Sequence, residues 1–520
     1  MSAKCILKKA VVVAVLAAGL MAAVSAAASS HRLPLPGQAI PAATKAQLYR
    51  APENAKSGSW TPLKNVYPGS MPDLALLLTD GTVMVHEGCS PDWFKLIPDN
   101  KGNYVRGTWS NIASMSSDYG PLYFASQVLA DGRVIANGGA YNFCSFAETN
   151  EGALYDPVSN SWTSITAPAG WSNIGAAPSV VRTDKTYQLA NCCSADAALA
   201  AISGTNVTWT ILSATQTGKK DSYGDEGWTT LPDQTILTID TGRCLSDQEA
   251  SCTEIFNINT NTWSDGQRTC GQMVDGKIGP AAMLPNGFVF AAGGTTTNCV
   301  MDTSTGQWYP APSFGGDLDA NSAPAAVLPS GSALVQVSPG AFNSPSHFFE
   351  AKVKDASTVT VTQVNDPSSA PSVAAYEGRM LVLPTGQVFW TNDAGDIEIY
   401  TAKGSPKAAW APKITKVAGT LSIGSSNNRI SGRNFNGFTF GGYYGAAAQT
   451  ATNYPLVRLT NAASGHVCYA RTHDHNRMGI ADGGKSSTKF DIPKSCEAGD
   501  SSLEVVANGI ASDPASITLQ

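Results

Sequence analysis

Two adjacent pairs of side chains and one further phenol have the types best suited to chemistry in this chain. Tyr376 precedes Glu377, and Asp225 precedes Glu226, so each pair offers two neighbouring groups that can bind a metal ion or exchange a proton. Tyr123 is a phenol of the same kind. These residues predict metal binding or acid–base chemistry if the fold brings them together.

Two of the six histidines lie in the segment Thr472-His473-Asp474-His475. Alternate side chains of an extended segment point the same way, so His473 and His475 are expected to share a face. Such a pair can ligate a metal or accept a proton, although on an edge strand it is more often exposed to solvent. Its value for chemistry depends on whether it reaches the acidic and phenolic residues.

A repeated polar turn predicts the elements that position these side chains. Apolar runs stop at seven short turns, which follow one another at intervals of 44 to 55 residues. The turn anchors are Asp80, Asp131, Asp184, Asp233, Asn286, Ser330 and Thr385. This spacing suits one four-stranded β-propeller blade per repeat and is long for a helical repeat. The fold is therefore predicted to be all-β, with a seven-bladed propeller.

Equivalent positions of the blades should meet at one end of the propeller, which we call the mouth. The position eight residues before each anchor marks the expected start of an innermost strand. These positions are Pro72, Tyr123, Ala176, Asp225, Ile278, Ser322 and Glu377. Three of them can bind a metal or a proton, and Tyr376 and Glu226 are their neighbours. The pattern predicts a polar mouth on an otherwise packed ring.

The ends of the predicted propeller follow from the need to leave no open sheet edge. Residues 59–62 can pair beside Ile397–Tyr400, which would close the ring between the two ends of a propeller spanning 59–411. After residue 411 the turn stops recurring and short strand-like runs follow. Residues 412–520 are predicted to form a small immunoglobulin-like β-sandwich.

With these residues in place, the mature chain resembles the galactose oxidase and glyoxal oxidase group of copper radical oxidases. Tyr123, before Asp131-Gly132, resembles the tyrosine that binds copper equatorially, and Tyr376 resembles the axial tyrosine. His473 resembles the histidine supplied by the C-terminal domain. The resemblance implies a kelch-type propeller with a copper site at its axis, capped by the second domain.

The chain departs from this family at three positions. The family has Tyr-His where this chain has Tyr376-Glu377, and the cysteine that the family cross-links to its equatorial tyrosine is replaced by Pro72. Tyr141 stands where galactose oxidase has a tryptophan over the cross-link. Tyr123, Tyr376, Glu377 and His473 would form a set richer in oxygen than the family's copper site, so iron becomes a candidate beside copper.

The first 28 residues have the composition of a secretion signal. Lys4, Lys8 and Lys9 precede an apolar run that ends at Ser25-Ala26-Ala27, and the run is short for a membrane span. Residues 29–58 are assigned to an N-terminal extension. The mature protein is expected to be secreted, without a membrane anchor.

Ten cysteines follow the predicted signal, an even number that indicates disulfides in an exported protein. The local pairings Cys244–Cys252, Cys270–Cys299 and Cys468–Cys496 are expected. The adjacent Cys192 and Cys193 could form either a vicinal disulfide, a rigid apolar feature at a binding surface, or two separate bridges.

Composition narrows the range of partners. The net charge is −6 with few charged residues, so no basic stripe for nucleic acid or anionic lipid is expected. A monomer acting on a small molecule or carbohydrate is predicted.

Three functions are consistent with these residues. The first is a metal-dependent oxidoreductase for an alcohol, aldehyde or carbohydrate, with Asp225, Glu226 or His475 as proton acceptor. The second is a non-catalytic propeller that binds a sugar or cell-surface glycan. The third is hydrolysis or lyase chemistry by the acidic residues.

Overall fold

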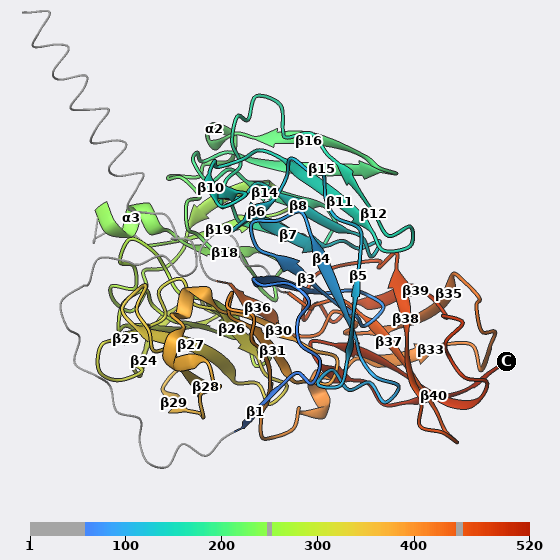
Figure 1. The fold of residues 1–520 in the computed structure, drawn as a ribbon. Coiled ribbons are helices and arrows are strands. Elements are labelled where there is room, and N and C mark those ends of the chain that lie inside the picture. The colour runs from blue at the N-terminus through green and yellow to red at the C-terminus, as the bar shows by residue number, and fades with distance from the viewer. Residues whose placement is uncertain (1–57, 247–251, 444–450) are drawn as a thin grey trace, which may run out of the picture. The chain divides into compact units, whose positions relative to one another are not determined.

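The computed structural model describes residues 58–246, 252–443 and 451–520, which belong to one compact unit. The predicted signal peptide and nearly all of the N-terminal extension lie outside the described residues. The fold is all-β, as the turn pattern predicts (Figure 1). The short helices described are α2 (Ala214–Thr217), α3 (Thr241–Ser246), η1 (Ala370–Ser372), η2 (Ala375–Glu377) and η3 (Ala408–Trp410).

Seven antiparallel groups of four strands follow one another along the first part of the chain, and we call each group a blade. Blade 1 comprises β2 (Pro72–Leu77), β3 (Val83–Glu87), β4 (Trp93–Ile97) and β5 (Thr108–Asn111). Blade 2 comprises β7 (Ala125–Val128), β8 (Val134–Asn137), β11 (Gly152–Asp156) and β12 (Ser161–Ser164). Blade 3 comprises β13 (Ser179–Val181), β14 (Tyr187–Ala190), β15 (Ala197–Ser203) and β16 (Asn206–Leu212). Blades 4 and 5 comprise β17 (Thr229–Thr230), β18 (Ile236–Ile239), β19 (Thr253–Asn257) and β20 (Thr262–Asp265); and β21 (Ala281–Met283), β22 (Phe288–Ala291), β23 (Asn298–Asp302) and β24 (Trp308–Ala311). Blades 6 and 7 comprise β26 (Ala325–Val327), β27 (Ala333–Pro339), β28 (His347–Asp355) and β29 (Thr358–Gln363); and β30 (Arg379–Val382), β31 (Val388–Thr391), β32 (Ile397–Thr401) and β1 (Ser59–Pro62). Short strands outside the blades are β6 (Pro121–Leu122), β9 (Tyr141–Asn142), β10 (Ser145–Phe146) and β25 (Leu318–Asp319).

The polar turns hold the two innermost strands of the blades together. The Asp184 carboxylate accepts a hydrogen bond from the Thr186 backbone N–H at 2.9 Å, and Asp233 accepts one from Thr235 at 3.1 Å. The residue after each of these two aspartates has a left-handed backbone, with φ of 75° at Lys185 and 72° at Gln234. The carboxylate therefore supports the turn even where glycine is missing.

The N-terminal strand closes the ring, as expected. β1 pairs with β32, with Trp60 opposite Tyr400 and Thr61 opposite Ile399. Figure 1 shows this blue strand beside the orange strands of blade 7. The Trp60 ring packs on Tyr400 at 4.9 Å and on Phe348 at 4.8 Å between ring centroids, which adds apolar contacts to the backbone pairing.

The second part of the chain forms a nine-stranded sheet with its own apolar core. Its strands are β33 (Lys413–Lys416), β34 (Thr420–Leu421), β35 (Asn428–Arg433), β37 (Leu456–Asn461), β38 (Val467–His473), β39 (Lys485–Asp491), β40 (Gly499–Ala507), β41 (Ile510–Ala511) and β42 (Ala515–Leu519). The boundary at 411/412 and the immunoglobulin-like assignment stay predictions.

One strand of the second part is inserted into the propeller. β36 (Phe440–Tyr443) pairs with β21 of blade 5 and β26 of blade 6, the innermost strands of neighbouring blades. The sequence analysis did not identify this segment.

Five disulfides join the ten cysteines. Cys244–Cys252, Cys270–Cys299 and Cys468–Cys496 form as expected. Cys192 and Cys193 form a vicinal disulfide, and Cys89 pairs with Cys144. In the part of the chain that the structure describes, no helix is long and apolar enough to cross a membrane.

Candidate ligand site at the propeller mouth

Three of the seven mouth positions share an unusual backbone conformation. Tyr123, Asp225 and Ser322 have φ of 55°, 58° and 56°, although L residues with side chains rarely occupy this left-handed region. All three lie eight residues before a turn anchor. Backbone strain repeated at equivalent positions is typical of functional regions, so the mouth is a candidate functional site.

A buried arginine that the sequence analysis missed organises one side of the mouth. Arg379 is 2% exposed and its Nη2 lies 2.7 Å from Asp73 Oδ1 and 3.9 Å from Asp393 Oδ2. Its Nη1 donates to the Tyr376 carbonyl oxygen at 2.9 Å, and its guanidinium carbon lies 5.6 Å from the centre of the Tyr123 ring. Arg379 therefore contacts both tyrosines that the resemblance singles out.

The carboxyl groups around Arg379 are in different electrostatic states. Arg379 and His86 hold the pKa of Asp73 below its usual value, although burial acts in the opposite direction. Burial raises the pKa of Asp393 well above its usual range, and Asp73 and Glu377 raise it further against the opposing effect of Arg379. The same buried guanidinium thus has two carboxyl neighbours whose pKa values are shifted in opposite directions.

Tyr376 and Glu377 lie together, as their adjacency suggests. The Tyr376 hydroxyl is 3.5 Å from Glu377 Oε1, and burial followed by the charges of Glu377 and Asp393 raises the pKa of Tyr376. Glu377 Oε2 accepts a hydrogen bond from the Ala374 backbone N–H at 2.8 Å. One carboxylate oxygen therefore holds the local backbone, and the other faces the phenol.

A chain of aromatic contacts continues from Tyr123 along the mouth. The Tyr123 and Tyr141 ring centroids are 6.0 Å apart, and Tyr141 contacts Phe146 at 5.9 Å. Two residues after Phe146, Glu148 Oε2 lies 3.4 Å from the Cys193 sulfur of the vicinal disulfide. Phe146 is 39% exposed, so this side of the mouth presents apolar surface to solvent.

Asp225 lies at the mouth and is paired with a cation. Its Oδ1 is 2.9 Å from Lys277 Nζ, which blade 5 supplies from just before Ile278. Farther round the ring, burial raises the pKa of Asp319 to about 7, with Asp275 and Asp317 adding to the shift. Hydrogen-bonding groups therefore continue beyond the aromatic side of the mouth.

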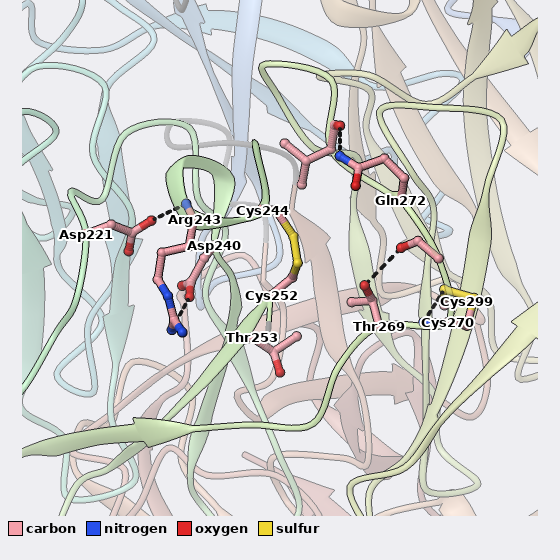
Figure 2. The surroundings of a disulfide bond; sticks show 12 residues. Asp221, Asp240, Arg243, Cys244, Cys252, Thr253, Thr269, Cys270, Gln272 and Cys299 are labelled. Carbon is pink, nitrogen blue, oxygen red and sulfur yellow. Dashed lines mark hydrogen bonds and ion pairs between the residues drawn. A yellow bond between two sulfur atoms is a disulfide. The ribbon is translucent and has the colours of Figure 1, made fainter. Parts of the chain in front are cut away.

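Glu226 belongs to a buried cluster of charges, and its role as proton acceptor stays a prediction. It is fully buried within blade 4, where Oε1 lies 3.0 Å from Lys219 Nζ and Oε2 accepts a hydrogen bond from the Thr238 hydroxyl at 2.9 Å. Lys219 also pairs with Asp221, Asp240 and Glu254. Figure 2 shows Asp221, Asp240 and Arg243 of this group beside the Cys244–Cys252 disulfide. Glu226 is therefore held by an ion pair and a hydrogen bond inside blade 4.

His473 and His475 lie at the other end of the inner strands, which we call the turn face. The His475 backbone N–H donates to the Ala130 carbonyl oxygen at 2.9 Å, next to the Asp131 turn. Tyr123 lies seven residues before Ala130 in the chain, ahead of β7. His473 is bound to Asp474 and Asp491, each at 3.2 Å. Both histidines thus have partners at the turn face, and their expected roles as metal ligand and proton acceptor stay predictions.

The mouth residues do not fit the copper centre of the resembled family. The cross-linking thiol is replaced by Pro72, Glu377 replaces one imidazole, and the predicted second imidazole of His473 is on the turn face. A fixed guanidinium also contacts both tyrosines, and its positive charge disfavours a metal cation beside it. The described donors at the mouth are phenol and carboxylate oxygens.

Comparison with known proteins supports a kelch-type propeller. The chain is 25% identical to the kelch-like protein terF of Aspergillus terreus over 263 residues, 46% of this chain and 53% of that protein. The match thus spans about half the length of that curated relative. No family model matches the chain.

Two solved structures give low similarity scores. A streptogramin B lyase has a TM-score of 0.47 and 9% identity, covering 67% of this chain and 98% of its own. A fungal alcohol oxidase of the AA5 family in complex with copper has a TM-score of 0.34 and 13% identity, covering 90% and 99%.

Proposed function

We propose that this protein is a secreted, monomeric propeller protein whose mouth binds a neutral polar ligand of the carbohydrate class without redox chemistry. The observation that carries the proposal is Arg379, a buried cation held by Asp73 and in contact with both Tyr123 and Tyr376.

The chemistry of the mouth suits a sugar. Sugars offer hydroxyl groups at their edges and apolar C–H faces, so sites for them combine polar side chains with aromatic surface. Here Asp225 with Lys277 supplies the polar groups, and Tyr141 with Phe146 supplies aromatic surface. The vicinal disulfide beside Glu148 adds a rigid apolar feature to the same side.

Five disulfides support an oxidising compartment for the mature chain. The proposed export signal lies outside the described residues. Edman sequencing of protein recovered from the medium tests it, because cleavage should occur close to residue 28.

Titration calorimetry against neutral oligosaccharides tests binding at the mouth. Asp225→Asn and Tyr141→Ala should each weaken binding about tenfold, since a lost hydrogen bond or stacking contact is worth about 1.4 kcal/mol. Asp156→Asn, in the outer hairpin of blade 2, makes the same chemical change away from the mouth and should leave binding intact. Equal binding by all three variants would refute the mouth as the site.

A metal-dependent oxidoreductase acting on an alcohol, aldehyde or carbohydrate is the second candidate. It is favoured by the hydroxyl of Tyr376 beside Glu377, together with the left-handed backbone at Tyr123. Phenolate and carboxylate oxygens would suit iron better than copper.

Metal content separates the two candidates. The secreted protein is loaded separately with copper and iron, and bound metal is quantified by mass spectrometry beside Tyr123→Phe. The binding proposal expects no stoichiometric metal in either protein. Near-stoichiometric metal that is lost in Tyr123→Phe, with a visible phenolate band, would replace it with the oxidoreductase.

A further inference from the structure

A cavity lies on the turn face, between the propeller and the second part of the chain. Its volume is about 1050 Å³, at the upper end of the range for small-molecule pockets. The propeller contributes the turn after β7 and parts of β14 and β15, and the second part contributes β33, β35 and β39 with the segment after β38. We propose that this cavity binds a sugar acid, a ligand with carboxylate groups and free hydroxyls.

The charges of the cavity favour an anion. Four cationic side chains line it, Lys185, Lys416, Arg429 and Lys489, against two acidic ones, Asp131 and Asp474. This local excess contrasts with the net charge of −6 for the chain. A concave site with one sign of charge concentrates ligands of the opposite sign.

The acidic side chains of the cavity already have partners. Asp474 Oδ2 lies 2.9 Å from Lys489 Nζ, and Asp131 Oδ2 lies 2.6 Å from Arg133 Nη2. Lys185, Lys416 and Arg429 have no ion pair among the described residues. The charge that a ligand meets is therefore that of the three unpaired cations.

The hydrogen bonds of His475 indicate that the ligand carries a hydroxyl group. Thr488 Oγ lies 3.0 Å from the His473 carbonyl oxygen and 2.9 Å from that of Lys489, so its single proton is donated to a carbonyl. Thr488 must then accept the 2.9 Å hydrogen bond from His475 Nδ1. The other ring nitrogen, Nε2, consequently carries a lone pair.

That lone pair has no partner in the described part of the chain, although His475 is 2% exposed and belongs to the cavity lining. An unpaired buried acceptor carries a desolvation cost that a ligand hydroxyl would relieve. Unpaired cations for a carboxylate and an acceptor for a hydroxyl together match a sugar acid.

The shape and apolar surface favour an oligomer over a single ion. The cavity is far larger than an inorganic anion requires, and its walls include Leu129, Ile202 and Val417. These apolar groups can pack against the C–H faces of sugar rings. Ser431, Ser487 and Asn476 add neutral polar groups beside them.

Calorimetry on the full mature protein tests the inference with trigalacturonate as the probe. A neutral galactose trisaccharide tests the role of charge, inorganic sulfate tests for a simple ion site, and propane-1,2,3-tricarboxylate tests the role of the hydroxyls. Trigalacturonate should bind at least tenfold more tightly than each of the other three, and more weakly as salt is added.

The double variant Lys185→Ala/Arg429→Ala should weaken trigalacturonate binding at least tenfold. Lys352→Ala/Lys354→Ala, which removes two lysines from β28 of blade 6, is the matched control and should bind as the wild type does. Absence of trigalacturonate binding, equal binding of the neutral sugar or the tricarboxylate, full competition by equimolar sulfate, or equal weakening in the control pair would each overturn the proposal.

Discussion

The buried lysine of blade 4 allows a prediction whose magnitude follows from the structure. Lys219 Nζ lies 2.7 Å from Glu254, 3.0 Å from Glu226 and 3.2 Å from Asp240, and it also binds Asp221. The side chains of the first three carboxylates and of the lysine are fully buried. One ammonium therefore faces four carboxyl groups, and replacing it by methionine leaves buried carboxyls without their shared cation.

Lys219→Met should lower the free energy of unfolding by roughly 3–5 kcal/mol at pH 8, the usual cost of breaking a buried ion pair from one side. Lys220→Met is the matched control next to it in sequence. Lys220 pairs with Asp265, but both side chains are 46% exposed, so its loss should cost no more than about 1 kcal/mol.

The cost of Lys219→Met should depend on pH. Burial raises the pKa of Asp240 to about 7 and raises that of Glu226, while Lys219 opposes both shifts. A carboxyl whose pKa is raised by folding stabilises the fold fully below its unfolded pKa, near 4, and this contribution is lost as pH rises through the folded pKa. Without Lys219 both pKa values should rise further, so the carboxyls keep their protons at pH 5.

The penalty of Lys219→Met should therefore fall to roughly 1–2 kcal/mol at pH 5, the cost of imperfectly paired neutral groups. Urea unfolding followed by tryptophan fluorescence measures it, and Trp263 is a local reporter because Lys219 Nζ lies 5.7 Å from its ring. Equal penalties for the two lysine variants at pH 8, or a Lys219→Met penalty that does not shrink at pH 5, would refute an ionised cluster.

Three further predictions concern the mouth, the ring closure and the disulfides. Arg379→Leu should lower the free energy of unfolding by roughly 3–5 kcal/mol, because it leaves the Asp73 carboxylate buried without its cation. A decrease below about 1 kcal/mol in urea unfolding would contradict this pairing. Trp60→Ala should lower the free energy of unfolding by about 3 kcal/mol and lower the melting temperature in calorimetry, because its ring packs on Phe348 of blade 6 and Tyr400 of blade 7. An unchanged melting temperature would show that β1 contributes little to closure. Replacing both cysteines of Cys89–Cys144 by alanine should lower the free energy of unfolding by about 4 kcal/mol, and replacing those of Cys244–Cys252 should lower it by about 2.5 kcal/mol. The difference arises because the entropy of the unfolded chain that a disulfide removes grows with the sequence separation, which is 55 for the first pair and 8 for the second. The reverse order would refute the entropic account.

The propeller could be predicted because its signal is local and repeated. Each turn anchor combines a polar side chain with a reversal between two apolar strands, and seven such anchors leave few alternatives. Lys185 and Gln234 stand where glycine is expected, yet both adopt the left-handed backbone because Asp184 and Asp233 hold the turns. The closing strand could be predicted by the same logic, since an unpaired edge is unfavourable.

The mouth could be predicted only in part. Counting back from the turns identified Tyr123 and Asp225, because the inner strands have similar lengths. It did not identify Arg379 or Asp393, although a lone arginine opening the apolar run Arg379–Val382 was a visible signal. Their importance depends on contacts between different blades, such as Arg379 with Asp73, which no local pattern encodes.

The histidines show why a resemblance at one segment does not by itself place a residue in the fold. The segment containing His473 and His475 crosses the turn face, where Thr472, His475 and Met478 donate backbone hydrogen bonds to the turns of blades 1, 2 and 3. β36 is instead the segment that enters the propeller. An alternating pattern predicts that two histidines share a face, but it cannot predict which end of the propeller that face meets. The two ends therefore require separate hypotheses, a neutral ligand beside Arg379 at the mouth and an anionic one beside Arg429 on the turn face.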